Sequence, residues 1–198
     1  MMKQEYLFLT ALLIVGILFI SGCVQQPTIK PTTTTQPSET PTAQSTNNFL
    51  TYDSPAYGIR IGYPSDWTKS EQFMGSVVAF LSPTESTSDI FRENLNVIVQ
   101  DLSTQPMTLD EYTELSVSQI KQFFTDANIT DSSATTLDGN PAHKVVYTGK
   151  QGQYNLKWMQ VWVVKENKAY IISYTAEVNK YPDFLGTIQQ MINSFEII

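Results

Sequence analysis

The stretch DGNPAHKVVYTGKQGQYNLKWMQVWVVKENKAYIISYTA, residues 138–176, contains three apolar segments that are separated by turn residues. The segments cover 142–148, 154–164 and 169–176, and each is rich in the β-branched and aromatic residues that favour strands. Breaker residues precede the first two segments, and Glu166-Asn167 is short enough to close a tight hairpin before the third. Sequential hairpins predict an antiparallel sheet.

Two amphipathic helices are predicted on either side of this stretch. Thr108-Leu109-Asp110-Glu111 has capping-box spacing, and Met107 and Tyr112 are placed for a hydrophobic staple. At 100° per residue one face of this helix would gather Leu109, Tyr112, Ile120, Phe123, Phe124 and Ala127. The last segment shows the same spacing, with Pro182 suited to a first turn. Its apolar residues are Tyr181, Phe184, Leu185, Ile188, Met191, Ile192 and Phe195.

Period-2 alternation predicts further strands at 57–63 and 95–99, and a shorter apolar run predicts one at 76–81. Residues 85–93 are polar and are expected to form a loop. The order is strands, helix, strands, helix, without βαβ alternation. This order predicts an α+β domain with helices packed on an antiparallel sheet.

Several short motifs in this region resemble the PsbP family. They are YGIRIGYPSDW (57–67), GNPA (139–142), YIISY (170–174) and MINSF (191–195). The resemblance implies an antiparallel sheet flanked by helices on both faces, a fold shared with a Ran-binding nuclear import factor. PsbP itself is an extrinsic subunit that supports ion retention in photosystem II. Fold-level resemblance is a poor guide to role, and the leader described next is similar to that of PsbP-like surface lipoproteins of archaea and other prokaryotes.

The N-terminus has the layout of a secretory signal. A basic start is followed by an apolar run over residues 6–20 and by Ser21-Gly22-Cys23. FISGC (19–23) resembles the lipobox of prokaryotic lipoproteins, which implies cleavage before Cys23 and acylation of its sulfur. The alternative is an uncleaved anchor, because residues 6–22 reach the lower limit of about 17 residues for a membrane span. Both interpretations predict an extracytoplasmic domain at the membrane.

Residues 24–47 contain eight Thr, two Ser and four Pro, and almost no large apolar side chain. Such a segment cannot bury enough surface to offset its ordering entropy, so it is predicted to be a disordered linker. As a flexible coil it would span about 27 Å. Its composition fits a bare spacer or an O-glycosylated stalk equally well. The predicted organisation is a leader (1–23), a linker (24–47) and one domain (48–198).

Composition excludes several functions. The formal charge is −7, with basic residues scattered singly, so neither nucleic acid nor an anionic headgroup surface is an expected partner. His143 is the only histidine, and no nucleophile elbow, zinc-protease motif or phosphate-binding glycine loop is present. We therefore expect no catalytic residues, no cofactor and no enzyme activity. His143 is interpreted as a strand residue.

The remaining candidate sites each have a simpler explanation. Asp110, Glu111 and Glu114 could bind a cation, but acids in a first turn also stabilise the helix dipole. The three tryptophans, Trp67, Trp158 and Trp162, could stack a ligand, although the parity of the last two indicates a buried sheet face. Asn128-Ile129-Thr130 is a formal N-glycosylation sequon at Asn128.

The sequence thus predicts a lipid-anchored accessory domain that docks on another envelope protein. The alternative is a receptor for a small ligand or for Ca²⁺, which needs only oxygen ligands and leaves no obligatory motif.

Overall fold

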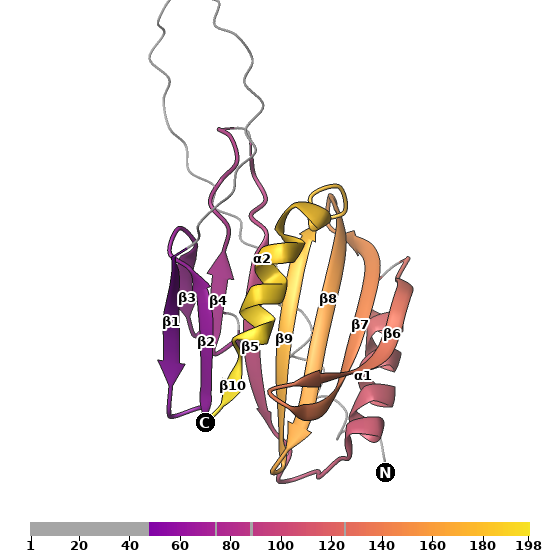
Figure 1. The fold of residues 1–198 in the computed structure, drawn as a ribbon. Coiled ribbons are helices and arrows are strands. Elements are labelled where there is room, and N and C mark those ends of the chain that lie inside the picture. The colour runs from indigo at the N-terminus through magenta and orange to yellow at the C-terminus, as the bar shows by residue number, and fades with distance from the viewer. Residues whose placement is uncertain (1–47, 74, 88, 125) are drawn as a thin grey trace, which may run out of the picture.

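The computed structural model describes residues 48–198 except residues 74, 88 and 125 (Figure 1). The described part contains two helices, α1 (Leu109–Phe123) and α2 (Tyr181–Asn193). Its strands are β1 (Phe49–Ser54), β2 (Ile59–Pro64), β3 (Thr68–Glu71), β4 (Val78–Leu81), β5 (Asn94–Asp101), β6 (Asn128–Leu137), β7 (Asn140–Gln151), β8 (Tyr154–Lys165), β9 (Lys168–Glu177) and β10 (Glu196–Ile197).

The predicted hairpins form one half of a seven-stranded antiparallel sheet of order β3-β4-β5-β9-β8-β7-β6. The β8–β9 turn is formed where the sequence predicted a tight hairpin, and the β6–β7 turn lies in a segment that was predicted only to contain breaker residues. Glu166 and Asn167 close the β8–β9 hairpin with φ of 52° and 57°, and Asp138 and Gly139 close the β6–β7 hairpin with φ of 48° and 69°. Two successive residues of positive φ are typical of the type I′ turn, whose twist matches that of the strands.

The two helices cover opposite faces of this sheet, as predicted (Figure 1). Ile188, Met191 and Ile192 of α2 belong to one buried cluster, together with the inward residues of β8 and β9 that face them. Tyr112 and Ile120 of α1 belong to a second cluster, which includes the residues of alternate parity on the same strands. The fold is therefore α+β, with antiparallel sheets and helices on both faces.

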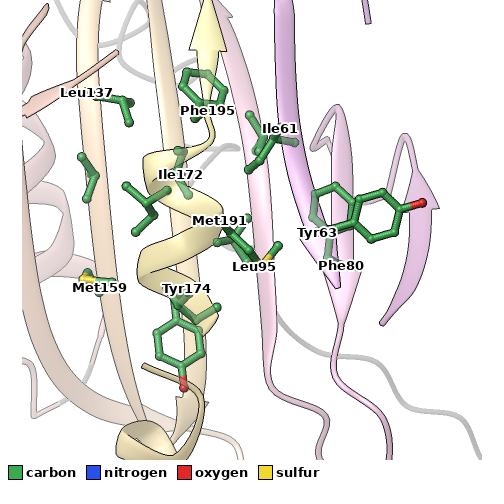
Figure 2. Close-up of a cluster of buried hydrophobic side chains, with 14 of the residues drawn as sticks. Ile61, Tyr63, Phe80, Leu95, Leu137, Met159, Ile172, Tyr174, Met191 and Phe195 are labelled. Atoms are coloured by element: carbon green, nitrogen blue, oxygen red, sulfur yellow. The ribbon is translucent and has the colours of Figure 1, made fainter. Parts of the chain in front are cut away.

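A second sheet, of order β1-β2-β10, lies on the same side of the large sheet as α2. Ile59, Ile61 and Tyr63 of β2 join the α2 cluster, and the ring of Tyr63 stacks on that of Phe80 with centroids 4.6 Å apart. Figure 2 shows Ile61 and Tyr63 on one side of α2 and Leu137 and Met159 on the other. Helix α2 thus lies between β2 and the β6–β7 hairpin, although β10 of the small sheet contacts the hairpin turn through Ile197 and Asp138.

The structure differs from the sequence-based prediction in several elements. Strands β1, β3, β6 and β10 were not predicted, and the strand predicted at 57–63 runs over Ile59–Pro64. Tyr57 and Gly58 form the preceding turn, which Gly58 allows with a φ of 69°. The sequence also predicted wider apolar faces on both helices than the structure has. Helix α1 ends before Phe124, and both Phe123 and Leu185 are exposed.

Candidate binding groove between the β6–β7 hairpin and helix α2

A hollow of about 410 Å³ lies between the β6–β7 hairpin and the C-terminal half of α2. We call this hollow the α2 groove. It is lined by Thr135, Thr136, Leu137, Asp138, Gly139, Lys144, Met159, Val161, Gln189, Ile192 and Asn193. Its volume is within the range of about 300–1,000 Å³ that is typical of small-ligand sites.

The two walls of the α2 groove present polar side chains. Thr135 and Thr136 come from β6, where exposure alternates along the strand and Leu137 at its end is buried. Gln189 and Asn193 come from α2, and their spacing of four residues places them on one face of the helix. Gln189 Nε2 donates to Asn193 Oδ1 over 2.9 Å, so the two amides are held together.

The floor of the α2 groove is aliphatic. Met159 and Val161 are both buried on β8, and they point to the side of the sheet that α2 covers. Ile192 and Leu137 complete the apolar lining from the helix and from the hairpin. Strand side chains alternate between the two faces of a sheet, so the β8 residues of this floor lie on the face that also forms the core under α2.

The two charged groups of the α2 groove both have partners, but only Lys144 is paired with an opposite charge. Lys144 Nζ lies 2.9 Å from Asp131 Oδ2, and the ammonium group holds the pKa of that carboxyl below its usual value. Asp138 Oδ2 accepts a hydrogen bond of 3.1 Å from the backbone N–H of Ile197. The lining therefore offers hydroxyl and amide groups more than it offers free charge.

The Asp138 bond also locates the α2 groove in the molecule. Ile197 pairs with Ile59 at the end of the small sheet where β1 finishes, because Ser54 also pairs with Ile59. The described chain enters β1 at the other end, where Phe49 pairs with Pro64. The β6–β7 turn that lines the groove thus lies at the end of the domain opposite the start of β1 (Figure 1).

His143 behaves as the strand residue that the sequence indicated. Its Nε2 lies 2.9 Å from the Ser132 hydroxyl, and its ring stacks on Trp162 with centroids 5.7 Å apart. Asp131, the acid next to Ser132 in the sequence, is paired with Lys144 instead. Ser132 and His143 thus form a hydrogen-bonded pair, and no third group in the described residues completes a catalytic triad with them.

The three tryptophans do not form one surface. Trp67 belongs to the α2 cluster, whereas Trp158 and Trp162 belong to the α1 cluster on the opposite face. Trp162 Nε1 donates to Thr113 Oγ1 over 2.9 Å, which satisfies its polar atom within the core. A shared stacking surface is therefore wrong, and the alternative of a buried sheet face is confirmed for Trp158 and Trp162.

The acids of the first turn of α1 serve the helix. Thr108 Oγ1 accepts the backbone N–H of Glu111, and the Glu111 carboxylate accepts the N–H of Thr108. The backbone N–H and the hydroxyl of Thr108 both donate to this carboxylate and hold the pKa of Glu111 below its usual value. Within residues 48–198, as far as they are described, no three His, Cys, Asp or Glu side chains gather in a way that could hold a metal ion.

The modification sites stay predictions. Asn128 is exposed at the start of β6, where a glycan would have room. Cys23 and the linker over 24–47 lie outside the described residues. Among those that are described, neither helix has the length and apolarity that a membrane span requires.

The α2 groove itself was not predicted. Gln189 and Asn193 look like ordinary polar positions of an amphipathic helix, and Thr135 and Thr136 lie in a strand that the sequence did not reveal. These pairs come together only because the β6–β7 hairpin lies next to α2 in the folded domain. The one local signal was the turn at Asp138-Gly139, which indicates a hairpin but not its partner.

An antiparallel sheet with α2 and a small second sheet on one face and α1 on the other defines the class of this domain. A family model described as PsbP-like protein matches residues 7–197. The chain belongs to this family. The comparison with curated proteins gave no match.

Solved structures share the fold at low sequence identity. The solution structure of cyanobacterial PsbP (CyanoP) from Synechocystis sp. PCC 6803 is 15% identical with a TM-score of 0.56, over 81% of this chain and 98% of that one. LpqN, involved in cell envelope biogenesis of Mycobacterium tuberculosis, is 12% identical with a TM-score of 0.53, over 76% and 86%. The Saccharomyces cerevisiae Ran-binding protein Mog1p is 9% identical with a TM-score of 0.54, over 77% and 96%. At such identities the likeness is one of fold.

Proposed function

We propose that this protein is a non-enzymatic binding module that docks on another component of the cell envelope. We further propose that lipid on Cys23 holds the module at the extracytoplasmic face of the membrane. The observation that supports docking most strongly is the position of the α2 groove. The β6–β7 turn that lines it lies at the end of the domain opposite Phe49, where the predicted tether joins.

This geometry suits a tethered receptor. A six-residue strand is about 17–20 Å long, so the two ends of the small sheet are separated by about that distance. A partner could occupy the groove without competing with the attachment of the linker. The fold is also compatible with binding, since one protein that shares it is described as Ran-binding and another as involved in cell envelope biogenesis.

Anchoring is tested by replacing Cys23. Wild-type protein purified from its own membranes should have the mass of a chain that begins at Cys23 and bears lipid. Cys23→Ala should lose that mass increase and leave the membrane fraction after processing, because stable anchoring takes two acyl chains. A Cys23→Ala protein that still gained lipid mass and kept its size on a gel would contradict the lipobox interpretation.

Docking is tested by crosslinking in intact cells. Wild-type protein should repeatedly form a crosslink to the same envelope component, and Cys23→Ala should form less of it because its local concentration falls. Repeated recovery of no partner by the membrane-bound wild type would contradict the proposal.

A second candidate function, a receptor for a free small ligand, is favoured by the size of the α2 groove. A ligand present at 100 times its Kd should raise the free energy of unfolding by about 2.7 kcal/mol. Thermal melts with millimolar Ca²⁺ test the cation version directly. A melting temperature that Ca²⁺ does not change would exclude the cation receptor.

A further inference from the structure

We infer that the α2 groove binds an extended, uncharged peptide segment, and that the side-chain amides of Gln189 and Asn193 pair with the backbone of that segment. This inference rests on the proposed docking function, since the envelope partner would supply the segment. It adds the chemical class of the ligand and the residues that recognise it.

The amide pair on α2 has the hydrogen-bonding pattern of a peptide group. Because Gln189 Nε2 already donates to Asn193 Oδ1, Gln189 retains a free carbonyl oxygen and Asn193 retains a free NH₂ group. A peptide group offers one N–H and one C=O, so it can donate to the first and accept from the second. Both side chains are exposed, and therefore accessible to a ligand.

The opposite wall offers one more neutral group. Thr135 lies on the same face of β6 as Leu137, which packs in the cluster with α2, whereas the side chain of Thr136 points to the other face. The Thr135 hydroxyl combines a donor with acceptor lone pairs and is not hydrogen-bonded within the described residues. The only cation among the lining residues, Lys144, is bonded to Asp131. An anionic ligand would have to compete with Asp131 for Lys144 and would be repelled by the carboxylate of Asp138, whereas an uncharged segment would meet neither obstacle.

The floor favours an aliphatic side chain. Met159, Val161 and Ile192 present methyl and methylene groups, and methionine adapts its shape readily to a ligand. Of the residues that line the groove, none is aromatic, so the flat face of a sugar ring would find no ring to stack on. This difference favours a peptide over an N-acetylated glycan, although both contain amides.

The test uses the full-length chain in detergent micelles and fluorescein-labelled, capped hexapeptides of Gly and Ser with Ala, Val, Leu or Met at one central position. Fluorescence polarisation should show saturable binding that is tighter for the larger aliphatic residues. The double variant Gln189→Ala/Asn193→Ala should bind about tenfold or more weakly, since two hydrogen bonds at about 1 kcal/mol each are lost. Gln190→Ala is the matched control, because Gln190 is exposed on the same helix and does not line the groove.

Three results would overturn the inference. The first is no saturable binding of any of the four peptides up to about 1 mM, a concentration that corresponds to a binding free energy of about −4 kcal/mol. The second is unchanged affinity in the double variant. The third is tighter binding of an N-acetylglucosamine tetramer that depends on Gln189 and Asn193, because it would identify a glycan site.

The intact-cell crosslink separates this inference from the proposed function. If the double variant still forms the wild-type crosslink, the docking function stands and the groove is not its site. If the wild type forms none, docking itself fails, whatever the peptides show.

Discussion

Glu93 is a carboxyl group in an unusual place, since its residue is only 2% exposed. Burial, together with the nearby carboxylates of Glu85 and Asp89, raises its pKa to about 7. Backbone N–H groups of Glu93 itself and of Glu177 bond to the carboxylate and act in the opposite direction. A charged Glu93 is thus costly in the folded protein at neutral pH.

This residue should make stability depend on pH. Because its folded pKa lies above the ordinary glutamate value of 4.5, its contribution to stability is fully present below pH 4.5 and is lost as pH rises through about 7. Glu93→Gln should therefore be more stable than wild type above pH 7, by about 2–3 kcal/mol, and should match it near pH 4.5. Urea unfolding of both proteins between pH 4.5 and 8 measures the difference, and a difference that does not change with pH would contradict this prediction.

Leu137 is the last residue of β6 and is only 2% exposed. Its side chain packs in the same buried cluster as α2. Leu137→Ala should lower the free energy of unfolding by about 2–4 kcal/mol, because it removes buried methyl groups and leaves a cavity beside the α2 groove. Leu50→Ala is the control, since Leu50 is 46% exposed and should change stability by less than about 0.5 kcal/mol. Denaturant titration compares the two, and equal effects would show that the hairpin does not pack as described.

Helix α1 starts where the sequence predicted, because the residues that define its start lie close together in the chain. The capping box between Thr108 and Glu111 satisfies helix donors that would otherwise lack partners. Thr108→Ala should therefore cost about 1 kcal/mol and lower the melting temperature by about 2–4 °C. Thr104→Ala, in the exposed turn before the helix, should leave the melting temperature unchanged. A thermal melt in which both variants equal wild type would mean that the cap does not contribute to stability.

The strands divide into those with a readable pattern and those without one. Strands β7, β8 and β9 were predicted because both faces of the central sheet are buried, which requires continuous β-branched and aromatic residues. β6 was missed because it is an edge strand of Ser, Thr and Asp, with only Leu137 buried at its end. β1 was missed for a similar reason, since only Tyr52 of its six residues is buried. An edge strand owes its place to backbone pairing, which leaves little trace in side-chain hydrophobicity.

Different parts of the chain lie at the two ends of the domain. The chain enters at Phe49, next to the start of β1, and the β6–β7 hairpin meets β10 at the opposite end. The leader and the linker are predicted from composition and from adjacent residues, and they stay predictions because they lie outside the described residues. The α2 groove could not be predicted, because it joins side chains more than fifty positions apart in the chain.

The most direct test of docking through the α2 groove is photo-crosslinking at single positions in intact cells. A photoreactive residue at Gln190, which is exposed on α2 next to Gln189 and leaves both amides of the groove in place, is compared with one at Asp66, which is exposed beyond the end of β2 near the chain entry. We expect a strong crosslink to one envelope component from position 190 and little or none from position 66. A crosslink from position 66 without one from position 190 would contradict docking through the groove.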